Sequence, residues 1–76
     1  MPRLVATSWK VLKAVFEADN FKLERQTDSH LVYSKAGITR PVIIPKYDEV
    51  GLDIIRRNMR TAGMSRQRYF ELLKKV

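Results

Sequence analysis

Cysteine is absent from the 76-residue sequence, and histidine occurs only once. The lack of cysteine excludes disulfide bonds and thiol catalysis, and it is typical of proteins of the reducing cytoplasm. Only three glycines and three prolines occur and 45% of the residues are hydrophobic, so the composition is that of a globular protein. No apolar run approaches the roughly 18 residues of a membrane-spanning helix, and there is no signal-peptide core. We therefore expect a soluble, cytoplasmic protein without a membrane partner.

Acidic residues are scarce relative to basic ones. Fifteen Lys and Arg against eight Asp and Glu give a formal net charge of +7. Such an excess attracts polyanions, of which nucleic acid is the most abundant in a cytoplasm, although solubility alone is the alternative explanation. The acidic residues show no paired spacing of a two-metal nuclease, one histidine without cysteine cannot form a common zinc site, and no glycine-rich phosphate loop occurs. We expect a nucleic acid as partner, with no metal and no cofactor.

The length allows one domain, which we place at residues 1–76. A helix is expected near its start, because Ser8 is a favourable N-cap and apolar residues then recur at spacings of three and four. These apolar residues are Trp9, Leu12, Val15 and Phe16. Asn20 tolerates the left-handed conformation, so the helix is expected to end at Asp19-Asn20.

Three segments with strand character follow, at residues 21–26, 29–33 and 41–45. The first alternates apolar and polar residues, which predicts a half-buried strand. The third is rich in β-branched residues and has prolines at both ends, as suits an edge strand or a strand end. Because short turns at Thr27-Asp28 and at residues 35–37 join the segments, we expect an antiparallel meander.

Two further helices are expected in the C-terminal half. Gly63 ends the first of them and Ser65 caps the second. Their packing residues are Leu52, Ile55, Met59 and Ala62 in one helix, and Tyr69, Phe70, Leu72 and Leu73 in the other. The order is α-β-β-β-α with a short terminal helix. This predicts an α+β fold with a three-stranded antiparallel sheet and helices packed on one face, like a double-stranded RNA-binding domain.

His30 is the candidate for catalysis. An imidazole can take or give a proton near neutrality, and RNA carries its own nucleophile, the 2′-hydroxyl group. One base with some cationic stabilisation therefore suffices for strand cleavage without a metal. Asp28 and Ser29 could tune the protonation of His30, but ordinary turn chemistry also favours both residues. Alternatively, His30 only fills a strand position; it shares a strand face with Val32, and one of the two is expected in the core.

Basic residues suggest a path for RNA phosphates. The expected RNA-binding residues are Lys35, Arg40, Lys46, Arg56, Arg57 and Arg60. The three arginines gather on the exposed side of the second helix, where guanidinium groups suit phosphate binding, although a solvated face is the alternative. Tyr47 adds an aromatic ring that could stack on an unpaired base.

Over about residues 11–73 the chain resembles the HicA-like (YcfA-type) mRNA interferase toxins. The motifs that carry the resemblance are Val15-Phe16 followed by Asn20-Phe21, then Asp28-Ser29-His30, Val42-Ile43-Ile44-Pro45, and the segment from Arg60 to Ser65. The resemblance implies a fold like that of double-stranded RNA-binding domains, metal-independent cleavage of mRNA with His30 as the catalytic residue, and a HicB-like antitoxin. Asp28 stands where the family has glycine, and Tyr47 stands where it often has a second histidine.

Three hypotheses follow. The first is a HicA-type RNA endonuclease in which His30 is the general base, supported by Ser29, Lys46 and Tyr47. The second is a non-catalytic RNA-binding module on the same fold, which the change to Asp28 favours. The third is a protein-interaction domain whose basic face meets an acidic partner. The expected partners are mRNA and a HicB-like antitoxin, and a homodimer is left open.

Overall fold

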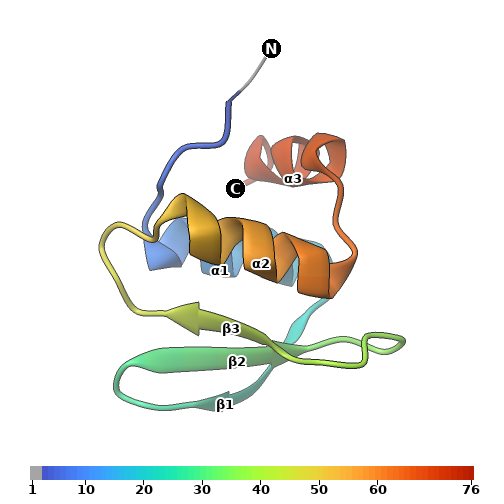
Figure 1. Ribbon diagram of the computed structural model, residues 1–76. Coiled ribbons are helices and arrows are strands. Elements are labelled where there is room, and N and C mark those ends of the chain that lie inside the picture. Colours follow the sequence, from blue (N-terminus) through green and yellow to red (C-terminus); the bar gives the residue numbers. More distant parts are fainter. Residues whose placement is uncertain (1–2) are drawn as a thin grey trace.

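The computed structural model describes residues 3–76, which form three helices and one three-stranded sheet (Figure 1). In chain order these are α1 (Trp9–Ala18), β1 (Lys22–Gln26), β2 (His30–Ser34), β3 (Val42–Pro45), α2 (Leu52–Ala62) and α3 (Arg66–Leu73). The expected α+β order and the helices on one face of an antiparallel sheet are confirmed. The expected domain span of 1–76 includes residues 1–2, which lie outside the described residues.

The helix ends follow local chemistry. The Ser8 and Ser65 hydroxyls each accept a hydrogen bond from the backbone N–H three residues further along, which caps α1 and α3. Asn20 and Gly63 adopt left-handed conformations, with φ of 70° and 65°, just after α1 and α2. All four positions confirm the expected helix boundaries.

The sheet has the order β1-β2-β3, with both strand pairs antiparallel. One face packs against α1 and α2, and no described helix lies on the other face (Figure 1). Side chains alternate between the two faces, so Leu31 and Tyr33 of β2 enter the core with Val42 and Ile44 of β3. His30 and Val32 point to the opposite face, which we call the outer face.

The expected half-buried alternation over residues 21–26 is correct only at Phe21, which is buried in the core just before β1, and is wrong for the rest. All five residues of β1 are exposed, because β1 is an edge strand and a register shift interrupts its alternation. Leu23 pairs with Tyr33 on the core face, yet Arg25 pairs with Val32 on the outer face. A β-bulge between Leu23 and Arg25 therefore turns the second half of β1 over.

Val32 is buried and His30 is exposed, so one of the pair is covered by protein, as expected. Val32 is nevertheless on the outer face and outside the main core cluster. Its direct neighbours in register are Arg25 on one side and Ile43 on the other. Cross-strand neighbours on one face contact each other, so these two side chains shield Val32 from solvent.

Between residues 3 and 76, no helix is long and apolar enough to cross a membrane.

Candidate functional site

The turn between β1 and β2 fixes the backbone of His30. The Thr27 N–H donates to the His30 carbonyl at 2.9 Å, and the His30 N–H donates to Thr27 Oγ1 at 3.0 Å. The Ser29 carbonyl accepts from the Lys46 N–H at 2.9 Å, which connects the turn to the end of β3. Held on both sides, His30 begins β2 with an exposed side chain.

The His30 ring has one hydrogen-bond partner next to it in the sequence. Ser29 Oγ lies 3.1 Å from His30 Nδ1. A hydroxyl can accept or donate, so it suits either neutral tautomer of the imidazole. When Nδ1–H donates to Ser29, the Nε2 lone pair is free to accept a proton.

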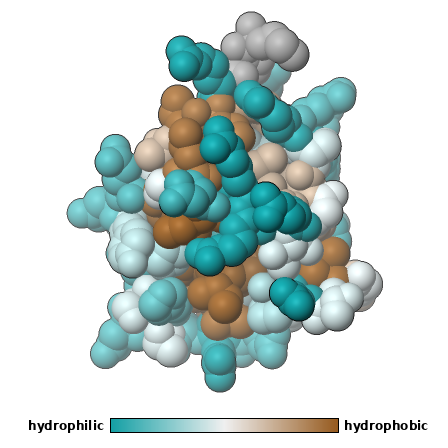
Figure 2. Space-filling model, in the orientation of Figure 1, coloured by the Kyte–Doolittle hydropathy of each residue, from teal (hydrophilic) through white to brown (hydrophobic). Residues whose placement is uncertain are grey.

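His30 opens on a cleft of about 300 Å³ between β3 and α2. The cleft is lined by His30, Pro41, Ile43, Pro45, Tyr47, Ile54, Arg57, Asn58 and Thr61. Asn58 Nδ2 donates to the Ile43 carbonyl at 3.2 Å, so α2 is tied directly to the edge of β3. In Figure 2, apolar surface is visible near the boundary between α2 and β3, with hydrophilic side chains around it. Such a mixture of apolar walls and a few polar groups is typical of a ligand-binding site.

The structure divides the three expected helix arginines between two surfaces. Arg57 lines the cleft with His30. Arg56 and Arg60 instead line a separate groove whose floor includes Met59. One phosphate beside His30 can therefore be reached by Arg57, whereas the other two arginines face a different part of the surface.

The two residues after β3 also have different positions. Tyr47 is 52% exposed and its side chain lines the cleft. Its carbonyl accepts from the Trp9 N–H at 3.1 Å, which fastens the loop to the start of α1. Lys46 Nζ lies 5.7 Å from the centre of the Trp9 ring, in cation–π geometry, and Lys46 is absent from the cleft lining.

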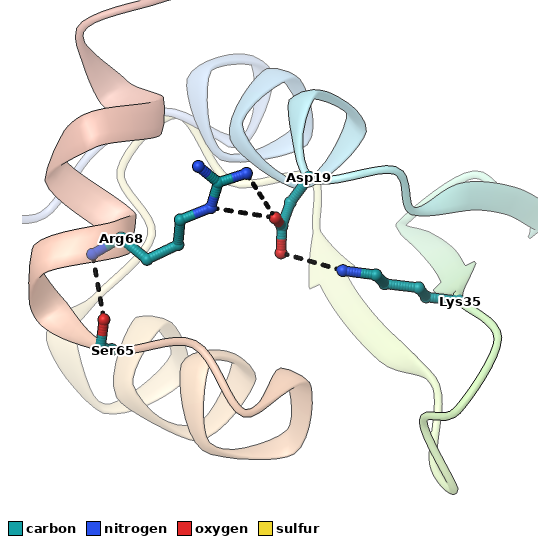
Figure 3. A network of polar contacts seen from close by, with 4 residues as sticks. All are labelled: Asp19, Lys35, Ser65 and Arg68. Carbon is teal, nitrogen blue, oxygen red and sulfur yellow. Dashed lines mark hydrogen bonds and ion pairs between the residues drawn. The ribbon is translucent and has the colours of Figure 1, made fainter.

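Lys35 and Arg40 lie at the other end of the strands from His30: Lys35 follows β2, and Arg40 precedes β3. Lys35 follows the opposite end of β2, where its Nζ is 3.5 Å from Asp19 Oδ2 and 5.3 Å from the centre of the Phe21 ring. Figure 3 shows Lys35 pointing at Asp19. Arg40 is exposed in the segment before β3. The structure thus does not bring these two cations to the cleft.

Sequence reasoning missed three residues around His30. Thr27 was expected only as a turn residue, Asn58 lies in α2 with no motif to mark it, and Arg25 was expected in an ordinary alternating strand. The turn-forming character of Thr27 was the one available signal. The contacts of Asn58 and Arg25 depend on packing and register, which have no local sequence pattern.

Metal-ligating side chains do not gather near this cleft. Within the described part of the chain, no group of three or more His, Asp or Glu side chains is placed to hold a metal ion. The cleft instead offers an imidazole, a phenol, a guanidinium group and an amide, which are groups that transfer protons or bind anions.

Comparison with known proteins gives one family match. The model of the HicA toxin of bacterial toxin–antitoxin systems matches residues 9–64, from the start of α1 to just beyond α2. Comparisons with curated proteins and with solved structures found no significant match. Because the matched region covers most of the 76 residues, including the turn of His30 and the whole cleft, the chain belongs to the HicA toxin family.

Proposed function

We propose that this protein is a metal-independent endoribonuclease that cleaves mRNA, with His30 as its general base. The observation that carries the proposal is the exposed His30 imidazole at a cleft that also contains Arg57 and Tyr47. Membership of the HicA family supports it, since HicA toxins are generally mRNA interferases. The net charge of +7 favours a polyanionic substrate.

In the proposed reaction, His30 Nε2 removes the proton of a ribose 2′-hydroxyl group. The 2′-oxygen attacks the adjacent phosphorus, the bond from phosphorus to the 5′-oxygen breaks, and a cyclic phosphate forms. The 5′-oxygen leaves with a proton from an acid or from water. No metal is needed because the nucleophile belongs to the substrate, and Arg57 offsets the charge that develops on the phosphate. Ser29 holds Nδ1 so that Nε2 faces the substrate.

His30→Ala tests the catalytic assignment. We expect cleavage of labelled single-stranded RNA to fall by roughly 10²–10⁴-fold, the usual contribution of a general base. The His30 side chain is exposed, so folding should be unchanged by circular dichroism and by urea denaturation. Affinity for an RNA blocked by 2′-O-methyl groups should also change little.

Lys74→Ala, at the distant end of α3, is the matched control for a lost polar surface group. The assays contain a chelator, so that contaminating metal-dependent nucleases are inactive. Cleavage by His30→Ala at the native rate would eliminate His30 as the base. RNA binding without any cleavage by the native protein would instead favour the non-catalytic module, for which Asp28 next to Ser29 is the supporting feature.

We further propose that the partner of this toxin is a HicB-like antitoxin that covers the cleft. Family membership supports a toxin–antitoxin partner. An antitoxin bound over Tyr47 and Arg57 would exclude RNA from His30. In a pull-down with a HicB-like antitoxin, Arg57→Glu should weaken the complex. Unchanged binding would place the antitoxin on another surface.

A further inference from the structure

The β-bulge in β1 has a consequence for charge on the outer face of the sheet. Lys22 pairs with Ser34, and Arg25 pairs with Val32, so both cations share the face of His30. Without the register shift between Leu23 and Arg25, strict alternation would turn Arg25 to the core face with Leu23. The bulge therefore keeps two cations of β1 on the side of the sheet that no described helix covers.

Arg25 is also a close neighbour of His30. Thr27 lies directly opposite His30, as their two hydrogen bonds show, and Arg25 is two residues before Thr27 on the same strand. Diagonal neighbours on one face of an antiparallel pair are roughly 7–8 Å apart, within reach of a long side chain. His30 thus has a guanidinium group on each side: Arg57 across the cleft and Arg25 across β1.

The outer face offers a path between these two cations. Val32 and Ile43 lie opposite each other in its middle, and Ile43 is 47% exposed and also lines the cleft. The three strands span about 10 Å at the usual spacing of about 4.8 Å. Neither Lys22 nor Arg25 forms an ion pair with a described residue, and both are exposed. The two β1 cations are therefore available for an anionic ligand.

We infer that Arg25 and Lys22 form a second phosphate-binding subsite, and that a single RNA strand runs from the cleft, past His30, across the outer face of the sheet to β1. The ligand chemistry is the sugar-phosphate backbone of unpaired RNA, because the path follows isolated cations and the exposed apolar side chain of Ile43. The inference rests on the proposed function in taking RNA as the ligand.

The test compares two lengths of 2′-O-methyl RNA, which binds without being cleaved. A dinucleotide has a single phosphate and cannot occupy the cleft and the β1 subsite together, whereas an oligonucleotide of about ten nucleotides reaches both. The variant is Arg25→Gln combined with Lys22→Gln, and the matched control is Lys74→Gln combined with Lys75→Gln, which removes the same charge at the end of the chain. Affinity is measured against salt by fluorescence anisotropy for the longer RNA and by NMR titration for the dinucleotide.

For the longer RNA, the slope of log K against log salt should be shallower by about 1.4 in the β1 variant. Two phosphate contacts are lost, and each contact on a single strand contributes about 0.7 to the slope. The variant's affinity should fall at least tenfold more than that of the control, while the affinity for the dinucleotide stays near the native value. Three results would overturn the subsite: an unchanged slope, an equal loss for both RNA lengths, or an equal loss in the lysine control.

The failure of this inference is distinguishable from the failure of the proposed function. Native cleavage together with native binding by the β1 variant would remove the subsite and leave the nuclease intact. If RNA affinity depends on the β1 cations but the native protein never cleaves unmodified RNA, the subsite stands and the nuclease proposal falls. If the native protein binds neither RNA, both proposals fall.

Discussion

In the proposed cleavage, His30 supplies a single imidazole to a reaction that needs both a base and an acid. Once Nε2 has taken the proton of the 2′-hydroxyl group, another donor must protonate the leaving oxygen. Lys46 and Tyr47 follow β3, but Lys46 lies over the Trp9 ring and only Tyr47 lines the cleft with His30. The Tyr47 hydroxyl is therefore the acid that the geometry favours.

Tyr47→Phe separates this role from base stacking. We expect kcat to fall about 10²-fold or more, because the acid is lost, while the affinity for RNA stays close to native, because the ring remains. Single-turnover cleavage measures the first quantity and anisotropy with blocked RNA measures the second. Tyr47→Leu should lower both. A native kcat in Tyr47→Phe would assign the proton donation to water or to Lys46.

The pKa of Tyr33 makes the stability of the fold depend on pH. Its hydroxyl donates to Glu17 Oε2 at 2.7 Å, and burial together with this carboxylate raises the pKa of Tyr33 well above its ordinary value. The same hydrogen bond lowers the pKa of Glu17. A raised pKa stabilises the folded state fully below the pKa of the unfolded chain, and this stabilisation is lost as pH rises beyond it.

We therefore expect the free energy of unfolding to decline above about pH 10, where tyrosine ionises in the unfolded chain but Tyr33 remains protonated in the folded one. Urea denaturation between about pH 8 and 11 measures this decline. In Tyr33→Phe the decline should be shallower, with a remainder from Tyr69, whose pKa burial also raises. An equal slope in the two proteins would contradict the assignment.

Among the secondary-structure elements, α3 is attached by charge as well as by apolar packing. Asp19, at the end of α1, accepts from Arg68 of α3 at 3.0 Å and 3.2 Å, and pairs with Lys35 after β2 at 3.5 Å (Figure 3). The same Arg68 donates its backbone N–H to the Ser65 cap. One carboxylate thus connects three elements that are distant in the sequence.

Asp19→Ala should destabilise the protein by about 1.5–3 kcal/mol, the usual range for hydrogen bonds to charged groups. The loss is limited because Arg68 and Lys35 are partly exposed and can turn to water. Urea denaturation measures it. The control is Lys13→Ala, which breaks the exposed Lys13–Glu17 pair on α1 and should cost only about 0.3–0.5 kcal/mol. An Asp19→Ala protein as stable as this control would show that packing alone holds α3.

For the whole molecule, the two faces of the sheet differ in what covers them. The face under α1 and α2 contains the core, including Tyr33 and Ile44. The outer face presents His30, Arg25 and the exposed Ile43. No described helix covers the outer face, which is the surface where the proposed RNA path runs.

The cations behind the net charge of +7 lie on several different surfaces of the molecule. Arg57 lines the cleft, Arg56 and Arg60 line a separate groove, and Lys35 forms an ion pair with Asp19. The three arginines of α2, which the sequence predicted on one exposed side of the helix, therefore belong to two surfaces. Residues one apart on a helix point about 100° from each other, so adjacent arginines in α2 cannot share one ligand as readily as residues four apart.

The sequence by itself determined the family, the order of helices and strands, and the helix ends at Ser8, Asn20, Gly63 and Ser65, all confirmed. These features depend on neighbours within a few residues, through side-chain caps, left-handed turns and hydrophobic periodicity. Only the tertiary structure decided that Arg25 faces outward, that Asn58 joins α2 to β3, and which cations surround His30. Those contacts depend on strand register and on the packing of distant segments, which local residue preferences do not specify.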